Sequence, residues 1–351
     1  MHTLESWSHD VHPFGRLIIN VPFNVKVVPV NAEEFPFQDK AFLALYADTE
    51  KGHAMIDVIQ WNQFFKCHVE VRDHEKELLF NGMITEDGHK AFQHKNIPLE
   101  CLIQVPVKFG VSLHVQEEGN ADVEDMECHQ VHINTQNGDT LLKNLKCGTV
   151  HAHSWTGNIK CVSSLQGNIE LKTGNGGAIK ADKLQGQHVQ CKTQDGTIQV
   201  KSVYADDANF WSQSGAIYLG SVHGSTVVDV HNKGDVKIDS LDGSLNALMK
   251  EGNLAAHITR HEEVTVRTGK GDISLDLPVS ANTSLELLGS QVEVDKALSV
   301  ENVEEKKEGN LTKFTGKMNS SGKGSVKSEA RDGKIVVTAK DWFESLNLSK
   351  K

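Results

Sequence analysis

Apolar and polar residues alternate in a pattern that returns about every nineteen residues between Val131 and Gly289. Turn glycines mark the pattern, with successive spacings of 19, 20, 19, 19, 19, 18, 19 and 18 residues. They are Gly138, Gly157, Gly177, Gly196, Gly215, Gly234, Gly252, Gly271 and, more weakly, Gly289. A fixed period of this length is typical of stacked structural repeats.

Two apolar columns follow each glycine, two and four residues after it. The first contains Thr140, Ile159, Ile179, Ile198, Ile217, Val236, Leu254 and Ile273. The second contains Leu142, Cys161, Ala181, Val200, Leu219, Ile238, Ala256 and Leu275. The column between them is mostly polar, as in a β-strand with one buried face, whereas a helix would repeat its apolar residues three and four apart.

The strand before each glycine alternates in the same way. Its predicted inward column is Val131, Val150, Ile169, Val189, Ala208, Val227, Leu245 and Val264. We therefore predict an all-β chain that folds as a β-solenoid (β-helix) with coils of about 19 residues and irregular capping regions at both ends. The same local pattern also allows a meander of hairpins, but like residues recur in columns over eight successive units, which favours stacked coils.

Four parts are predicted along the chain. Residues 1–14 are expected to be disordered or poorly ordered, and residues 15–125 to form all-β N-terminal coils or a cap. Residues 126–298 form the regular solenoid, and residues 299–351 a charged loop at 301–310 followed by a C-terminal cap. Strands are expected at residues 42–46, 68–72, 77–80 and 334–339, and the apolar side chains of Trp342, Phe343, Leu346 and Leu348 are expected to cover the open end.

Composition narrows the classes of partner. The net charge of -11 argues against a protein that binds nucleic-acid backbones, which carries a basic surface. Six cysteines without a C-x-x-C pair suit a reduced, intracellular protein. The first residues lack the apolar core of a secretory signal, and no apolar run approaches the length of a membrane span, although a presequence could already have been removed from a longer precursor.

The best candidate for metal binding is a group of three histidines. His132 and His151 share an outward column on neighbouring coils, and His153 lies two residues further along the same strand. Imidazoles about 4.8 Å apart could ligate zinc, nickel or copper. The alternative is a chance cluster, because the chain contains 18 histidines. No cofactor is expected.

Two further features could carry function. Trp211 and Tyr218 are predicted to point outward on the strands flanking Gly215, where they could bind a partner or a sugar ring; the alternative is an aromatic column that only shields the strands. Asp229 stands in an otherwise apolar inward column, followed by His231, and a buried aspartate often marks a functional site. A local bulge that turns both residues outward is the alternative.

The repeat resembles that of a known family. It has the form t-x-x-G-x-I-x-l-x-x-l-x-G, as in residues 173–186 and 193–203. Together with the Val-Pro phrases and the residues at 342–346, it makes residues 15–348 similar to the "putative adhesin" domain of unknown function, and in particular to its eukaryotic branch called family with sequence similarity 185. The resemblance implies a β-solenoid and, for some animal members, a mitochondrial location. It implies no catalytic residues.

Two classes of function follow. The first is a non-enzymatic scaffold or protein-binding, adhesin-like module, with an unidentified protein partner and the possibility of end-to-end self-association. The second is a carbohydrate-binding or carbohydrate-active protein, which would need two acids at a workable separation in a cleft. The expected location is intracellular, mitochondrial from the resemblance and otherwise cytoplasmic.

Overall fold

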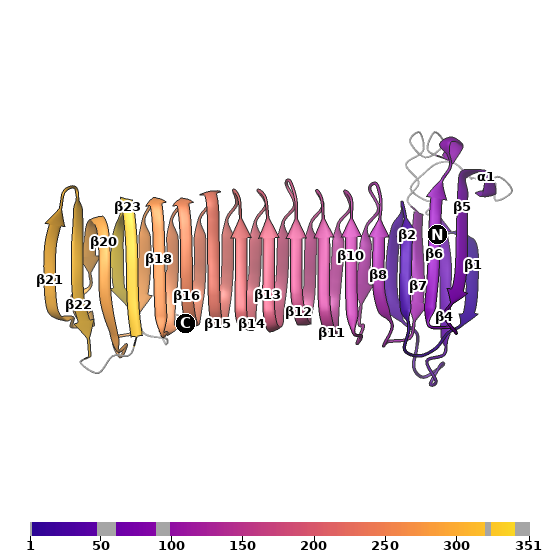
Figure 1. Cartoon of the computed structure of the whole chain (residues 1–351), viewed down its shortest axis with the longest axis horizontal. Coiled ribbons are helices and arrows are strands. Elements are labelled where there is room, and N and C mark those ends of the chain that lie inside the picture. The colour runs from indigo at the N-terminus through magenta and orange to yellow at the C-terminus, as the bar shows by residue number, and fades with distance from the viewer. Residues whose placement is uncertain (1, 48–60, 89–98, 320–323, 341–351) are drawn as a thin grey trace, which may run out of the picture. The chain divides into compact units, whose positions relative to one another are not determined.

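The computed structural model describes residues 2–47, 61–88, 99–319 and 324–340. The chain forms two compact units, Met1–Gly177 (unit 1) and Ala178–Lys351 (unit 2). Each unit is built from β-strands that stack as the coils of a β-solenoid, so the predicted fold class is confirmed (Figure 1). The apolar group at 342–348, predicted to cover one end, lies outside the described residues.

Besides a helical segment at residues 86–88, unit 1 contains one single-turn helix and twelve strands among its described residues. They are β1 (His2–Asp10), β2 (Arg16–Val21), β3 (Asn24–Pro29), β4 (Lys40–Ala47), α1 (Trp61–Phe64), β5 (Phe65–Arg72), β6 (Glu77–Ile84), β7 (Leu99–Val105), β8 (Gly110–Val115), β9 (Ala121–Glu124), β10 (Gln130–Thr135), β11 (Thr140–Ser154) and β12 (Ile159–Thr173). The expected strands at 42–46, 68–72 and 77–80 are confirmed within β4, β5 and β6.

The coils of unit 1 stack in parallel and in the predicted register. Val131 pairs with Val150, and Thr140 pairs with Ile159 one coil further on. The stack begins earlier than the regular repeat, because β2 pairs with β8 and β3 pairs with β9 in the same parallel sense. Strands β2 and β7 end at Val21 and Val105, directly before Pro22 and Pro106, because proline has no backbone N–H to donate to a strand ladder.

Residues between β3 and β8 form a cap with antiparallel pairs. β4 pairs with β7, and β5 pairs with β6, while β6 and β7 continue the parallel stack on β2 and β3. The prediction of a poorly ordered N-terminus is wrong, since β1 pairs antiparallel with β4 and Trp7 packs against Phe80 with ring centroids 5.7 Å apart. Antiparallel pairing to a distant strand is a contact that local alternation does not reveal.

Unit 2 contains eleven strands and a short 3₁₀ helix among its described residues. They are β13 (Ile179–Thr193), β14 (Ile198–Ser212), β15 (Ile217–Lys233), β16 (Val236–Glu251), β17 (Leu254–Arg260), β18 (Glu263–Lys270), β19 (Ile273–Leu277), β20 (Thr283–Val294), η2 (Lys296–Leu298), β21 (Glu301–Glu308), β22 (Leu311–Met318) and β23 (Gly324–Ala339). Its first predicted apolar column is buried throughout, because Ile179, Ile198, Ile217, Val236, Leu254 and Ile273 are each at most 2% exposed.

The coil that follows β18 and β19 in the stack comes from the end of the described chain. β23 pairs in parallel with β18 and β19 on one side and with β20 on the other (Figure 1). Gly271 therefore stacks against Gly333 and not against Gly289, since a Cβ on Gly333 would lie 1.9 Å from the Gly271 carbonyl oxygen. Gly289 as the ninth turn glycine is a wrong prediction, because it lies inside β20.

The predicted charged loop at 301–310 is instead mostly a strand. Glu301–Glu308 forms β21, which pairs antiparallel with β22, and β22 pairs antiparallel with β20. Every β21 side chain whose burial is described is exposed, so no apolar alternation marks it in the sequence. Its row of glutamates and lysines lies along an edge, where charges oppose pairing with another chain. End-to-end self-association stays a prediction.

The corners are held by polar side chains that stack from coil to coil. Inward hydroxyl groups bond to turn backbone, as when Ser154 Oγ donates to the Gly138 carbonyl at 3.1 Å and Thr173 Oγ1 donates to the Gly177 carbonyl at 2.7 Å. Turn aspartates accept from the next coil, as when the Asn158 backbone N–H donates to Asp139 Oδ1 at 2.7 Å. These bonds satisfy buried backbone groups that the corners would otherwise leave unpaired.

Candidate functional site

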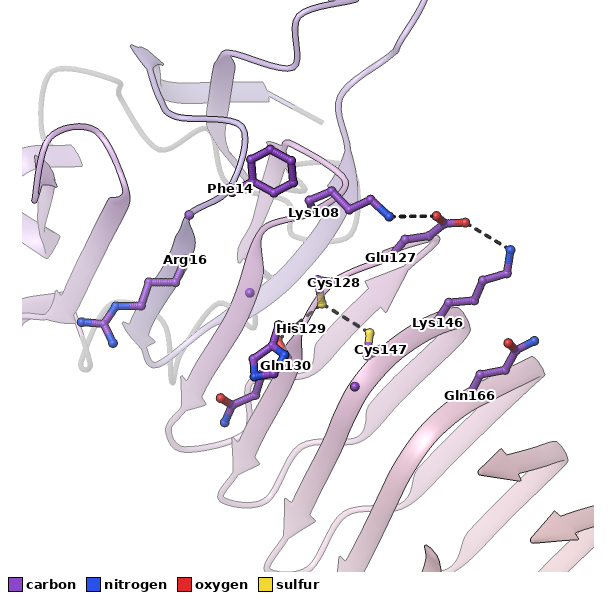
Figure 2. A pocket seen from close by; sticks show the side chains of 13 residues that line it. Phe14, Arg16, Lys108, Glu127, Cys128, His129, Gln130, Lys146, Cys147 and Gln166 are labelled. Carbon is purple, nitrogen blue, oxygen red and sulfur yellow. Dashed lines mark hydrogen bonds and ion pairs between the residues drawn. The ribbon is translucent and has the colours of Figure 1, made fainter. Parts of the chain in front are cut away.

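A cavity lined by chemically active side chains lies in unit 1, where successive coils turn a corner. It has a volume of about 660 Å³ and is lined by Arg16, Lys108, Glu127, Cys128, His129 and Cys147, among others (Figure 2). Gly110 and Gly148 also line it. Because glycine has no side chain, neither position adds a side chain that would fill the cavity.

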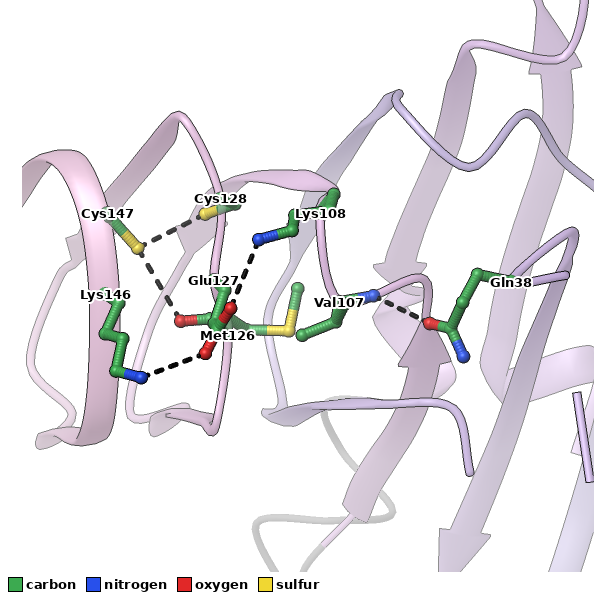
Figure 3. Close-up of polar contacts among 8 residues, drawn as sticks. All are labelled: Gln38, Val107, Lys108, Met126, Glu127, Cys128, Lys146 and Cys147. Atoms are coloured by element: carbon green, nitrogen blue, oxygen red, sulfur yellow. Dashed lines mark hydrogen bonds and ion pairs between the residues drawn. The ribbon is translucent and has the colours of Figure 1, made fainter. Parts of the chain in front are cut away.

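An ion-pair bridge crosses one side of this cavity. Glu127 accepts from Lys108 Nζ at 3.2 Å and from Lys146 Nζ at 3.1 Å, which joins three neighbouring corners (Figure 3). The loop that carries Lys108 is fixed by the Val107 backbone, whose N–H donates to Gln38 Oε1 at 3.1 Å. Hydrogen bonds from the two lysines, that from Lys146 first, lower the pKa of Glu127. The bridge therefore stays charged at neutral pH.

Two thiols meet at the floor of the cavity. Cys128 and Cys147 lie one coil apart, with their Sγ atoms 3.3 Å from each other (Figure 2). Each residue is 8% exposed. The apolar columns do not single out this pair, although its separation of nineteen residues equals one coil and could have identified it.

The three histidines predicted as metal ligands lie in the expected register. His132 pairs with His151 across β10 and β11, with ring centroids 6.1 Å apart. Both already have side-chain partners, because His132 Nε2 lies 2.9 Å from Asn134 Nδ2 and His151 Nδ1 lies 2.8 Å from Glu170. His153 stacks on Trp155.

No group of three or more His, Cys, Asp or Glu side chains within the described residues is arranged to hold a metal ion. Burial is the first cause that lowers the pKa of both His132 and His153, so both favour the neutral form. Metal binding by this group stays a prediction.

Trp211 and Tyr218 both lie on outward columns of unit 2, as expected. Tyr218 is 40% exposed and Trp211 is half-buried. Trp211 pairs with Asp229 of β15, and Tyr218 lies between Gln199 and Lys237. Neither ring contacts another aromatic ring in the part of the chain that the structure describes, so the two do not form one aromatic surface there.

The inward placement of Asp229 and His231 is wrong. Asp229 lies on the outward column between Trp211 and Leu248, and His231 is exposed. The pairing of β14 with β15 shifts by one residue between Tyr204 and Asp207, which turns Val228 and Val230 inward. A one-residue slip moves every following side chain to the other face of the strand. Val227, predicted inward, is consequently 38% exposed.

The repeat region of the chain matches the model of a known protein family. The model described as Toastrack DUF4097 matches residues 161–338, about half of the 351 residues. The chain belongs to the Toastrack DUF4097 family. The Toastrack domain has no established function, and its repeat accounts for the columns and corners described above.

Two solved structures are similar to this Toastrack chain over nearly its full length. A "putative adhesin" from Bacteroides fragilis NCTC 9343 is 12% identical, with a TM-score of 0.29 and coverage of 95% of this chain and 96% of that one. A "putative cell adhesion protein" from Clostridium sporogenes ATCC 15579 is 11% identical, with a TM-score of 0.18 and coverage of 96% and 99%. Within the residues described for the Toastrack chain, no helix has the length and hydropathy to span a membrane.

The Toastrack stack also contains an acidic pair that sequence analysis missed. On β9, Asp122 lies 3.3 Å from Lys26 Nζ, and Glu124 is bridged by Lys26 at 2.5 Å and Lys143 at 2.8 Å. Burial raises the pKa of Asp122 to about 6, while hydrogen bonds from Lys143 and Lys26 lower the pKa of Glu124 to about 2. Two acids with pKa values moved apart resemble an acid and base pair. Here Lys26 is paired with both acids and Lys143 is paired with Glu124. Neither acid lines the cavity described above.

Asp122→Asn is expected to stabilise the Toastrack chain at neutral pH. The pKa of Asp122 is higher in the folded state than the usual value of about 3.9, so between about pH 4 and 6 the folded state binds more protons than the unfolded state. Wild-type stability should therefore fall as pH rises through this window. Because 24% of the side chain is exposed, solvent screening limits the expected gain at pH 7 to about 1 kcal/mol.

Urea denaturation at pH 4 and pH 7 measures this effect. The difference between Asp122→Asn and wild type should grow from pH 4 to pH 7. Glu124→Gln is the matched control and should lose stability at both values, because the pKa of Glu124 is lowered by its lysines. Parallel pH profiles for wild type and Asp122→Asn would exclude a raised pKa at Asp122.

Proposed function

We propose that this Toastrack chain is a non-enzymatic β-solenoid scaffold that binds a protein partner through one outward sheet face of unit 2. The observation that carries the proposal is a group of apolar side chains on that face, Trp211, Val227 and Leu248, here called the Trp211 patch. Val227 is 38% exposed and Leu248 is 53% exposed. Aromatic and apolar anchors of this kind contribute most of the binding energy in protein interfaces.

Strand register brings the Trp211 patch together. Trp211, Asp229 and Leu248 occupy one outward column on three successive coils, and Val227 lies two residues before Asp229 on the same side of β15. Other members of these outward columns are polar, as with Asn209, Asn246 and Thr265. An apolar group framed by amides and charges fits an interface with an apolar centre and a polar rim.

A shallow groove continues the patch along the same face. It has a volume of about 420 Å³, includes Val227 in its lining, and carries Glu263 and Arg267. Groups of both signs can pair with the side chains of a protein segment. The combination favours a protein partner with an exposed apolar side chain flanked by charged residues.

Proximity labelling in cells with the tagged full-length chain tests this function. The double variant Trp211→Ser, Leu248→Ser is expected to lose a reproducible set of labelled proteins that wild type retains. Tyr218→Ser is the control, since it removes a more exposed aromatic ring that lies outside the patch. A purified partner from that set should bind the double variant about 30-fold more weakly, the effect of losing about 2 kcal/mol at an interface centre.

Two results would contradict the proposal. One is a set of labelled proteins that the double variant keeps unchanged. The other is a wild-type chain that labels no reproducible partner but binds a glycan array through Trp211 and Asp229, whose adjacent ring and carboxylate also suit a sugar. The second result would establish carbohydrate binding instead.

We also propose that the chain belongs to the eukaryotic branch named family with sequence similarity 185 and acts in mitochondria. The proposal is supported by the repeat phrases at 173–186 and 193–203 and by the residues at 342–346. The compartment in which the labelling occurs tests it, and labelling confined to cytoplasmic proteins would contradict it.

A further inference from the structure

Cys128 and Cys147 lie close enough to form a disulfide bond after a small rotation of their side chains. Their Sγ atoms are 3.3 Å apart, and a disulfide needs about 2.0 Å. They lie nineteen residues apart on neighbouring coils that are hydrogen-bonded to each other, since the Gly148 backbone N–H donates to the Cys128 carbonyl at 3.2 Å. Side-chain rotation can close the remaining gap without moving either coil.

The cavity gives small molecules access to this pair and not to the other thiols. Both cysteines line the 660 Å³ cavity at the coil corners (Figure 2). Cys101, Cys161 and Cys191 are inward-facing and at most 3% exposed. Burial raises the pKa of Cys67 to about 12, which keeps that thiol protonated and unreactive at neutral pH. Cys128 and Cys147 are therefore the thiols that a reagent in solution meets together.

The charges around the cavity favour an anionic ligand. Its lining contains Arg16, Lys108, Lys146 and one carboxylate, Glu127. Arg16 is paired with Glu77, which leaves the two lysines against one carboxylate, an excess of one positive charge. Glu127 holds the ammonium groups of Lys108 and Lys146 along one side of the cavity (Figure 3). A chain of net charge -11 would otherwise repel anions, so this local excess is selective.

We propose that the cavity over Cys128 and Cys147 is a thiol–disulfide exchange site that takes an anionic low-molecular-weight disulfide, of the class of oxidised glutathione. This site is independent of the Trp211 patch. It makes the oxidation state of the Cys128–Cys147 pair depend on the ratio of oxidised to reduced small thiols around the protein.

The exchange follows from the hydrogen bond between the two thiols. Either thiol can donate its S–H to the other, which places one sulfur to ionise and the second to keep its proton. With Cys128 as the donor, this hydrogen bond lowers the pKa of Cys147 and raises that of Cys128, so Cys147 is the more readily ionised thiol and the attacking group. Its sulfur attacks one sulfur of the small disulfide, forms a mixed disulfide and releases the first small thiolate. Cys128 then attacks Cys147 Sγ, which forms the Cys128–Cys147 bond and releases the second.

The overall step is balanced. The two cysteines lose two electrons and two protons, and the small disulfide gains the electrons and becomes two thiols that carry the protons. No other oxidant is needed. The reverse reaction, with an excess of small thiol, restores both cysteines.

Intact-mass spectrometry of the reduced full-length chain with oxidised glutathione tests the site. Wild type is expected to lose two hydrogen atoms through a transient adduct of one glutathionyl group. Cys128→Ser should accumulate that adduct on Cys147, because the resolving thiol is gone. Cys147→Ser should react at least tenfold more slowly than wild type. Cys161→Ser, a buried cysteine outside the cavity, is the control and should behave as wild type.

The ligand class is tested separately with the double variant Lys108→Gln, Lys146→Gln. It is expected to react several-fold more slowly than wild type with oxidised glutathione and at an unchanged rate with the neutral hydroxyethyl disulfide. Equal rates for anionic, neutral and cationic disulfides in wild type would overturn the anionic selectivity. Failure of Cys128→Ser to trap the adduct, or a wild-type pair that stays reduced while hydroxyethyl disulfide is in excess, would overturn the exchange site itself.

Discussion

Ile198→Asp is expected to destabilise unit 2 by roughly 4 kcal/mol or more, enough to unfold most of the central coils. Ile198 is fully buried and lies between Ile179 and Ile217 in register. An aspartate there would place an unpaired carboxylate among aliphatic side chains, which have no donor for it. Urea denaturation followed by far-ultraviolet circular dichroism measures the loss.

The adjacent residue on the same strand provides the control. Gln199 points outward, so Gln199→Asp adds the same carboxylate at an exposed position and should change stability by no more than about 0.5 kcal/mol. Equal denaturation midpoints for the two variants would mean that the assigned inward and outward faces of β14 are wrong.

Gly157→Ala is expected to cost on the order of 3 kcal/mol in unit 1 by pushing two coils apart. A Cβ at this position would lie 2.0 Å from the Gly138 carbonyl oxygen, which belongs to the backbone of the preceding turn. That backbone cannot rotate away as a flexible side chain could. The turn glycine is thus required by the close approach of the coils.

Gly110→Ala is the matched variant for comparison. The nearest heavy atom to its Cβ is 3.6 Å away, an ordinary contact, so the change should stay within about 0.5 kcal/mol. Hydrogen exchange should show faster opening at the Gly138 and Gly157 turns in Gly157→Ala alone. If both alanine variants were equally stable, contact between stacked turns would not be what requires glycine.

The regular coils could be predicted from the sequence because burial on one side of each strand repeats with the chain. Every member of the Ile179 to Ile273 column is buried as its alternation indicates. The same physics explains the failures. β21 is exposed on both faces and β1 is specified by pairing with β4, so neither leaves a periodic pattern in the sequence.

The directions of the candidate site residues depend on the lengths of the corners, which the sequence pattern shows less clearly than the strands. The corner between His223 and Ser225 has one residue fewer than the corner between Tyr204 and Asp207, which moved Asp229 outward and exposed Val227 and so changed an expected buried acid into part of a surface. Apolar alternation reports the period of a strand but not the length of its corner. The contact between Cys128 and Cys147 likewise required the coil length to be applied at a corner, since Cys128 lies between β9 and β10.

The position of β23 sets an order in which unit 2 can be completed. The polypeptide leaves β19, skips one level of the stack to make β20, and returns only with residues 324–339 to occupy the skipped level. Simple growth by adding each new coil to the last one cannot produce this arrangement. Until β23 enters, β18 and β19 on one side and β20 on the other present open hydrogen-bonding edges, and the contact that closes Gly271 against Gly333 spans 62 residues. During synthesis this level of the stack therefore has to wait until residues 324–339 have left the ribosome.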